Sequence, residues 1–218
     1  PVKRTGNIFS RNVISVIFVP LLLLLVIYPL VALFIHLNLE GVSRTLADSN
    51  FWICVKNTLI SAILAAVLGV VLAIGFGYLH LFKRKSVIYK IANLMNDLPI
   101  AIPHTVAGLA LLLAFGRNMF GFIGNTGLAF TLFAVILAMF FVSYPLAARN
   151  MSASVDNMDM EIVNVARTLG DSPAKAYFRV VLPTSGVALF SSFVLATSRS
   201  ISEFAAVIMF GGNVPGKT

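Results

Sequence analysis

The sequence predicts an all-α, polytopic transmembrane helical bundle that carries one cytoplasmic loop with short helices of its own. Two observations lead to this fold class. First, 59% of the 218 residues are hydrophobic and only 11% are charged, whereas soluble domains carry about 25% charged residues. Second, almost all basic residues lie between long apolar runs. We therefore expect lipid around most of the chain, and a single transmembrane domain over residues 1–218.

Five segments are candidates for membrane spans, because a helix needs roughly 20 apolar residues to cross the hydrocarbon core. They cover residues 13–35, 51–82, about 91–115, 128–148 and 185–210. The third span should be broken, since Pro99 and Pro103 each lack a backbone N–H and resist a continuous helix. Broken helices at membrane depth are tolerated where they are buried in protein or face a cavity. A sixth span is expected to follow the fifth.

The second predicted span has a face of small residues. Ala65, Gly69, Ala73 and Gly77 recur at intervals of four, which places them on one side of a helix. Small side chains allow another helix to approach closely. The pattern predicts helix packing in the bundle and no chemistry.

The distribution of Lys and Arg predicts the orientation, because short cytoplasmic loops are enriched in both. One side receives eleven basic residues: Lys3, Arg4, Arg11, Lys83, Arg84, Lys85, Lys90, Arg149, Arg167, Lys175 and Arg179. The other side receives four: Arg44, Lys56, Arg117 and Lys217. We therefore expect a multi-pass protein of the plasma (inner) membrane, with the N-terminus and the 149–183 loop in the cytoplasm.

Two other functions are suggested by the sequence and rejected. The net charge of +8 would favour nucleic-acid binding only if the basic residues gathered on one face of a soluble domain. Gly211, Gly216, Lys217 and Thr218 satisfy the P-loop expression. A P-loop needs a helix directly after it to hold the phosphates, and the preceding residues belong to a membrane span. We expect neither nucleic acid nor a nucleotide on this chain.

The loop over residues 149–183 is the most informative segment. Asp159 can cap a helix whose apolar residues follow the helical period, and Gly170 can end it. Asp171 or Ser172 can then cap a second helix with Pro173 at its first position. The sequence therefore predicts a short amphipathic helix, a turn, and a second helix that leads back to the membrane. Such a helix is suited to a groove on a soluble partner.

This loop resembles the EAA loop of binding-protein-dependent ABC importers. That pattern is Glu-Ala-Ala, three residues, Gly, nine residues, Ile, any residue and Leu-Pro. Gly170, Leu182 and Pro183 match, Ala166 matches the last Ala, and Val180 replaces Ile. Asn164 and Val165 depart from the pattern, and Glu161, one turn earlier, is the candidate replacement for the missing acid. The departure leaves a particular salt bridge to the ATPase unassigned.

The resemblance implies that the loop is a coupling helix that docks on a cytoplasmic ATPase. The residues assigned to this coupling are Glu161, Asn164, Ala166, Arg167, Gly170, Leu182 and Pro183. It also implies a second copy of the chain and an extracytoplasmic substrate-binding protein as partners. The chain itself is expected to be no enzyme, without catalytic residues, metal or cofactor, while ATP and Mg belong to the ATPase.

Further segments resemble molybdate and tungstate importers. They are residues 97–108, 199–204 and 212–218. The resemblance implies that an oxyanion is carried, molybdate or tungstate in the first place. Sulfate and thiosulfate importers share much of this pattern, so a sulfate permease is the alternative. An ion-coupled secondary carrier is the alternative from another class.

Polar residues near the third and fifth spans are candidates for a pathway or gate: His104, Thr105, Ser198, Arg199, Ser202 and Glu203. Ionisable groups inside a membrane are costly and usually functional. Two interpretations of Arg199 and Glu203 remain open. At spacing i, i+4 they can neutralise each other, or Arg199 can contact the passing anion. For His104, an interior structural role is favoured over ligand binding, and no role is assigned to His36 or His80.

Overall fold

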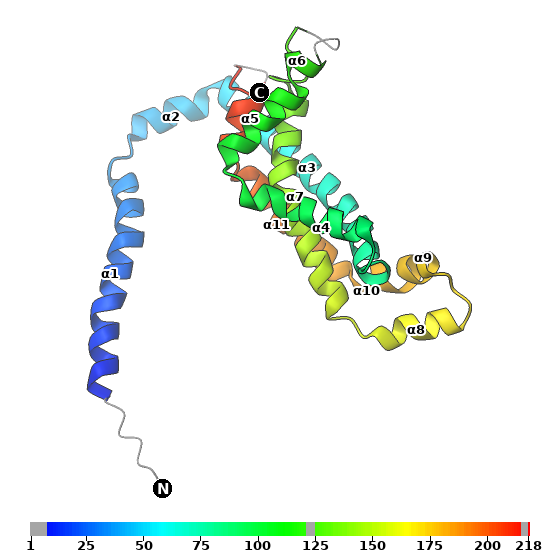
Figure 1. The fold of residues 1–218 in the computed structure, drawn as a ribbon. Coiled ribbons are helices and arrows are strands. Elements are labelled where there is room, and N and C mark those ends of the chain that lie inside the picture. The colour runs from blue at the N-terminus through cyan, green and yellow to red at the C-terminus, as the bar shows by residue number, and fades with distance from the viewer. Residues whose placement is uncertain (1–7, 121–124, 215–217) are drawn as a thin grey trace. The chain divides into compact units, whose positions relative to one another are not determined.

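The computed structural model describes residues 8–120, 125–214 and 218, and Figure 1 shows its helices. Within these ranges the chain forms no β-strand, and Gly116 and Gly127 make only an isolated antiparallel bridge. The predicted helical class is therefore confirmed. Residues 1–51 and 52–218 form two compact units, which are described separately. The expected single domain over residues 1–218 stays a prediction.

The first unit contains α1 (Ile8–Ile35) and α2 (Leu39–Ala47). Residues 17–35 of α1 are apolar enough to cross a membrane, and none of them is buried within the unit. This agrees with the predicted first span. The sequence analysis did not foresee α2, which begins where the Asn38 side chain accepts a hydrogen bond of 3.1 Å from the Glu40 N–H.

Two long helices form the frame of the second unit. They are α3 (Ser49–Phe82) and α7 (Leu132–Asp156), and both are long and apolar enough to span a membrane. The Thr131 side chain caps α7 by accepting a hydrogen bond of 3.2 Å from the Ala134 N–H. These helices correspond to the second and fourth predicted spans, and α7 continues two turns beyond the predicted end.

The predicted break in the third span is present. It separates α4 (Val87–Ala101) from α5 (His104–Phe115), and the two helices are bent by 118°. The short helix α6 (Arg117–Phe120) follows. The bend lies at Ile102 and Pro103, where Pro103 cannot donate a backbone hydrogen bond. The expectation that Pro99 also breaks the helix was wrong, because Pro99 is buried inside α4.

The C-terminal part differs from the continuous span predicted over residues 185–210. Six segments lie in this part: α8 (Met160–Thr168), α9 (Pro173–Ala176), the π-helix η1 (Tyr177–Val181), α10 (Leu182–Thr184), α11 (Gly186–Ile201) and α12 (Ala205–Phe210). The helix stops at Ile201 and restarts at Ala205. The prediction failed because Glu203 caps the new helix rather than continuing the old one. Residues Pro173–Thr184 and α11 are bent by 71°. When this pair and the α4–α5 pair are each counted as one span, the described residues contain up to five segments long and apolar enough to cross a membrane.

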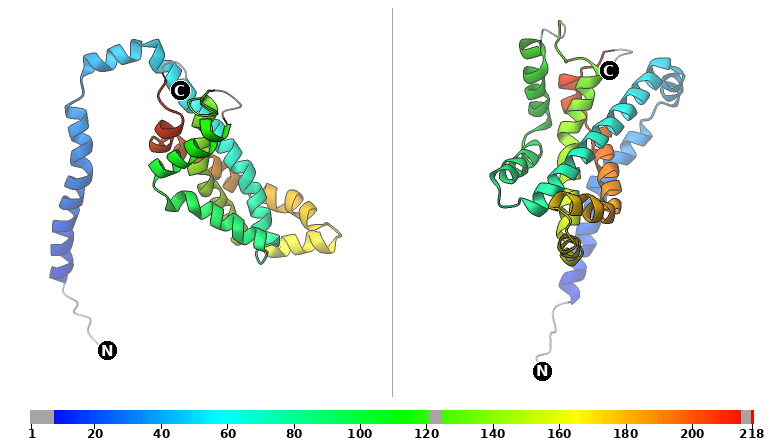
Figure 2. Two further views of the ribbon diagram at one scale, coloured as in Figure 1. Left: turned by 45° about the horizontal axis from the view of Figure 1, so that its top comes forward. Right: turned by 90° about the vertical axis from the view of Figure 1, so that its right-hand side faces the viewer.

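The core of the second unit joins α3, α7 and α11 (Figure 2). Ala65, Gly69, Ala73 and Gly77 are all buried, so the predicted packing face is confirmed. A Cβ atom added to Gly77 would lie 2.7 Å from the Tyr177 hydroxyl and 2.8 Å from Met151 Cγ. A larger residue at position 77 would therefore force the Tyr177 or Met151 side chain to shift.

Candidate functional site

A polar cluster surrounds the break between α11 and α12. The Arg199 Nη2 atom donates a hydrogen bond of 3.0 Å to the Glu203 carboxylate and lies 2.9 Å from His104 Nε2. Arg199 Nη1 donates to the Ser202 hydroxyl at 3.1 Å. The cluster therefore links the end of α11 to the first residue of α5, which are far apart in the sequence.

Glu203 also explains why α12 begins where it does. Its second carboxylate oxygen accepts a hydrogen bond of 2.9 Å from the Ala206 N–H, which would otherwise be an unsatisfied donor in the first turn of a helix. The close packing of α12 on α5 depends on Gly108, where a Cβ atom would lie 2.8 Å from the Ala206 Cα. The Glu203 carboxylate therefore neutralises Arg199 and also satisfies a backbone N–H in the first turn of α12.

The hydrogen-bond chemistry assigns a tautomer to His104. A guanidinium group can only donate, so His104 Nε2 accepts from Arg199 and the ring hydrogen lies on Nδ1. That Nδ1 atom is 3.8 Å from the Glu203 carboxylate, which is too long for a hydrogen bond. The Glu203 side chain is 2% exposed and the Arg199 side chain 25%. The expected Arg199–Glu203 pair is therefore formed, largely away from solvent.

Two of the predicted pathway residues do not join this cluster. Thr105 and Ser198 are exposed, and in the described part of the chain their hydroxyl groups make no hydrogen bond. A cavity of about 210 Å³ lies on another side of Glu203, and its polar lining comes from Asn57, Thr58, Glu203 and Thr218. The carboxylate therefore borders both the cluster and a cavity whose other walls are mainly apolar.

The loop that follows α7 folds as its sequence predicts. The Asp159 side chain caps α8 by accepting a hydrogen bond of 2.9 Å from the Glu161 N–H. Gly170 has φ +98°, and the Asp171 N–H donates back to the Ala166 carbonyl at 3.1 Å, which closes the helix. Of the two expected caps for the next helix, Ser172 is the one used, since it accepts from the Lys175 N–H at 3.3 Å.

Helix α8 is amphipathic, and one of its apolar faces is uncovered. Val163 is 1% exposed and packs into the core. Ile162, Val165 and Leu169 are 48%, 57% and 83% exposed, and helical spacing places these three on one side. We call this side the apolar face of α8. Glu161 and Asn164 are exposed beside it.

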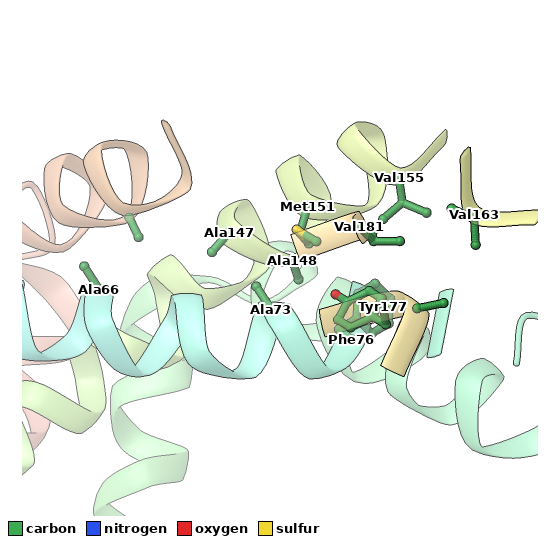
Figure 3. Packing of buried hydrophobic residues seen from close by; sticks show 12 residues of the cluster. Ala66, Ala73, Phe76, Ala147, Ala148, Met151, Val155, Val163, Tyr177 and Val181 are labelled. Atoms are coloured by element: carbon green, nitrogen blue, oxygen red, sulfur yellow. The ribbon is translucent and has the colours of Figure 1, made fainter. Parts of the chain in front are cut away.

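The segment after α8 is anchored in the core of the second unit. Tyr177 is fully buried, and its hydroxyl donates a hydrogen bond of 2.6 Å to the Ile74 carbonyl of α3. Figure 3 shows Tyr177 and Val181 in one cluster with Met151 of α7 and Val163 of α8. Packed side chains therefore connect α8 with α3 and α7.

The Leu182-Pro183 pair follows a π-helical turn. The Leu182 N–H donates to the Tyr177 carbonyl five residues earlier, and Pro183 has no N–H to continue an α-helical ladder. Such turns in helices frequently occur at functional sites. Leu182 is half-buried and Pro183 is exposed, and the pair lies in α10, directly before the 71° bend that leads into α11. Its role in coupling to an ATPase stays a prediction.

Comparison with known families decides the identity. A family profile described as "binding-protein-dependent transport system inner membrane component" matches residues 65–217. This range contains the polar cluster, α8 and the Tyr177 anchor. The chain belongs to this family. It is accordingly a multi-pass inner membrane component, and the predicted family resemblance is confirmed at this level.

Curated relatives of this inner membrane component carry different names. The probable transport system permease protein NifC of Clostridium pasteurianum is 30% identical, and the match covers 96% of this chain and 76% of the relative. The probable sulfate transport system permease protein cysT of Helicosporidium sp. subsp. Simulium jonesii is 33% identical over 96% and 80% of the two chains. The molybdenum transport system permease protein ModB of Haemophilus influenzae is 34% identical over 63% and 60%.

This inner membrane component also contains a polar network that was not predicted from its sequence. His80 is 5% exposed, and its ring contacts the Tyr89 hydroxyl at 2.8 Å and the Asp156 carboxylate at 2.9 Å. Arg84 donates to the same carboxylate at 3.1 Å. The network fastens the ends of α3, α4 and α7 to one another just before α8. A second ion pair, between Asp97 of α4 and Arg149 of α7, was also missed.

No local signal could have revealed these contacts, because the partners are far apart in sequence. His80 and Asp156 are separated by 76 residues, and Asp97 and Arg149 by 52.

Two residues of the rejected P-loop expression, Gly216 and Lys217, lie outside the described residues. Gly211 packs against α7, where a Cβ atom would lie 2.7 Å from Val135 Cγ2.

Proposed function

We propose that this chain is the permease subunit of an ATP-driven importer of a tetrahedral oxyanion. One observation carries the proposal: the apolar face of α8 is uncovered, while the opposite side of the same helix is fixed in the core through Val163. An exposed apolar helix face rimmed by polar residues is typical of a docking surface. A groove on a cytoplasmic ATPase is the proposed partner.

The proposed mechanism is alternating access driven by that ATPase. When the ATPase closes on ATP and Mg, it moves α8, and the buried contacts of Val163, Tyr177 and Val181 transmit the movement to α3 and α7. The break between α11 and α12 and the bend between α4 and α5 supply the places where the membrane segments can change direction. Packed interfaces of this kind have discrete arrangements rather than continuous ones.

The remaining partners follow from the same proposal. A second copy of the chain completes the pathway, and an extracytoplasmic binding protein delivers the anion. The N-terminus and the α8 loop lie in the cytoplasm of a cell with an inner membrane. Lipid surrounds the outer faces of the spans. ATP and Mg are held by the ATPase, and this chain contributes no catalytic group.

The polar cluster is the proposed contact region for the anion. Arg199 is bound to Glu203 but retains partial exposure of its side chain. The exposed residues Ser198 and Ser202 are close to it in the sequence, and the exposed Thr105 follows His104, which contacts Arg199. Hydroxyl groups with one partly neutralised cation bind a dianion weakly, which suits passage rather than storage. Molybdate or tungstate is the substrate proposed from the resemblance of residues 97–108, 199–204 and 212–218 to importers of these anions, and His104 is proposed to orient the guanidinium.

Sulfate is a second candidate with equal support. Several curated relatives with long matches are named sulfate permeases, among them the Helicosporidium protein and the CysT protein of Escherichia coli, which is 30% identical. Calorimetry of the cognate binding protein with molybdate, tungstate and sulfate separates the two. Tighter binding of sulfate would replace the first candidate with the second.

ATP hydrolysis in proteoliposomes tests the coupling role. The chain is reconstituted with its ATPase and binding protein, and hydrolysis is measured with and without the loaded binding protein. We expect Leu169→Asp to abolish stimulation, because it places a charge on the apolar face of α8. Met160→Asp is the matched control, since helical spacing places Met160 on another side of α8. Stimulation that survives Leu169→Asp would refute the docking surface.

A secondary carrier makes the opposite prediction for uptake. It would import the anion without the ATPase and lose uptake when an ionophore collapses the ion gradient. For the proposed importer, uptake depends on ATP and survives the ionophore. The same proteoliposomes, with labelled molybdate or sulfate added to the external solution, distinguish an ATP-driven importer from a secondary carrier in one experiment.

A further inference from the structure

The turn between α3 and α4 concentrates positive charge. Lys83, Arg84 and Lys85 are consecutive and exposed, and Lys90 follows one turn into α4. We call these four residues the basic turn. The first three line an open hollow of about 390 Å³ together with Leu81, Phe82 and Ser86. The hollow therefore combines apolar and cationic side chains.

Most of this charge is not balanced by the protein. The sequence contains no Asp or Glu from Ser49 through Asn96. Arg84 is paired with Asp156, but within the described residues the side chains of Lys83, Lys85 and Lys90 have no carboxylate partner. Arg167 of α8 adds a further cation, since its guanidinium lies 6.0 Å from the centre of the Phe82 ring. The hollow thus attracts an anion that the chain does not supply.

Helix α4 continues from the basic turn with an exposed apolar stripe. Val87, Ile91 and Leu94 are 69%, 55% and 60% exposed, and Leu98 follows on the same side by helical spacing. Cations at one end of an apolar stripe match the shape of a phospholipid, whose phosphate and acyl chains are joined. Basic clusters next to membrane helices attract anionic headgroups, with about 1 kcal/mol per basic residue.

We propose that the basic turn and the α4 stripe bind an anionic phospholipid. Its headgroup phosphate contacts Lys83 and Lys85 in the hollow, and its acyl chains lie along Val87, Ile91 and Leu94. Nucleic acid is disfavoured as the occupant, because the stripe that continues the site is apolar. The bound lipid lies next to Phe82 and Arg167, and therefore next to the C-terminal end of α8.

Native mass spectrometry of the full-length chain tests this site. The protein is released from mixed micelles that contain phosphatidylglycerol and phosphatidylcholine in equal amounts, and the bound lipids are counted. We expect preferential retention of phosphatidylglycerol. The double variant Lys83→Gln/Lys85→Gln should weaken that binding roughly 10- to 30-fold, as follows from about 1 kcal/mol for each charge.

Two matched variants separate a local site from general charge. Lys56→Gln/Arg117→Gln removes the same number of charges from exposed positions elsewhere, and it should leave the preference intact. Lys83→Arg/Lys85→Arg keeps the charge and should retain the lipid, which also shows that the turn tolerates substitution. Equal losses in the two Gln variants would overturn the proposal.

Inorganic phosphate distinguishes a lipid from a soluble anion. An excess of phosphate should not displace phosphatidylglycerol, because phosphate cannot use the apolar stripe. Displacement by phosphate, or equal retention of both lipids, would overturn the lipid site. These measurements use neither ATP nor a transported anion, so their outcome is independent of the proposed import function.

Discussion

The hydroxyl group of Tyr177 donates a hydrogen bond of 2.6 Å to the backbone carbonyl of Ile74. This bond joins the segment after α8 to α3 at a distance of 103 residues in the sequence. It is completely buried on the Tyr177 side, and Gly77 provides the space for it. The stability of the protein should therefore be sensitive to substitution at Gly77.

Substitution of Gly77 by Ala should disturb the junction directly. The new Cβ atom would lie 2.7 Å from the Tyr177 hydroxyl, and overpacking of this kind costs about 1–3 kcal/mol. The thermal unfolding midpoint of the purified protein should fall. Gly75→Ala is the control, because nothing lies within 4 Å of its Cβ position, and the midpoint should stay or rise. Equal midpoints for the two variants would contradict the close approach.

Substitution of Gly170 by Ala tests the turn after α8 without a steric clash. Nothing lies within 4 Å of the Cβ position, but φ is +98°, and a non-glycine residue there costs about 1–3 kcal/mol. We expect weaker stimulation of the ATPase by the binding protein. Gly186→Ala has equal space and an ordinary φ, and it should behave like the wild type. Hydrolysis in proteoliposomes measures both.

The Arg199–Glu203 pair should show energetic coupling in a double-mutant cycle. Arg199→Gln is expected to destabilise more than Glu203→Gln, because the Glu203 side chain is 2% exposed and the Arg199 side chain 25%. The Glu203 carboxylate that is left unpaired in Arg199→Gln has less access to water than the Arg199 guanidinium that is left unpaired in Glu203→Gln. The double variant should recover about 0.5–3 kcal/mol relative to the sum of the single variants. Additive shifts in unfolding would contradict a direct pair.

Asp171 should make the stability of the loop depend on acid pH. The hydrogen bond from Lys175, together with the charges of Lys175 and Arg179, lowers the pKa of Asp171 below the ordinary value of 3.8. A lowered pKa means that the charged form favours the folded loop. The contribution of the charged Asp171 to the stability of the folded loop is complete above pH 3.8, and it disappears as the pH falls through the lowered pKa. Asp171→Asn should therefore be less stable than wild type at pH 7, with the difference vanishing below pH 3.8.

Unfolding midpoints measured from neutral to acid pH check this prediction. Asp159→Asn is a useful comparison, because Asp159 caps α8 through its side-chain oxygen, which Asn retains. If the difference in unfolding midpoint between Asp171→Asn and wild type persists unchanged below the pKa of Asp171, the assigned ion pairs are contradicted. Such a constant difference would indicate lost packing or hydrogen bonding.

The local features were predictable where one short segment contains the whole cause. Asp159, Gly170 and Ser172 act on backbone groups within a few residues, so their types and spacing predicted the ends of α8 and the start of α9. The break at Pro103 has the same origin. The prediction for Pro99 was wrong because α4 continues through this residue, which is buried two positions before Ala101 ends the helix.

The fifth span could not be predicted correctly from its hydrophobicity. An i, i+4 pair such as Arg199 and Glu203 is compatible with a continuous helix, yet Glu203 turns one carboxylate oxygen to the Ala206 N–H and begins α12 there. The packing of α12 against Gly108 of α5 favours this arrangement. That packing involves segments almost 100 residues apart.

Composition and short-range spacing were sufficient to predict the membrane environment, the positions of the apolar segments and the capped loop. Which polar groups meet depends on the folded arrangement of distant helices: His104 contacts Arg199, His80 contacts Asp156, and Tyr177 contacts Ile74. Each of these contacts closes a long loop of chain, and its geometry depends on how α3, α5, α7 and α11 pack. Helix packing is set by the fit of whole surfaces, which no single segment encodes.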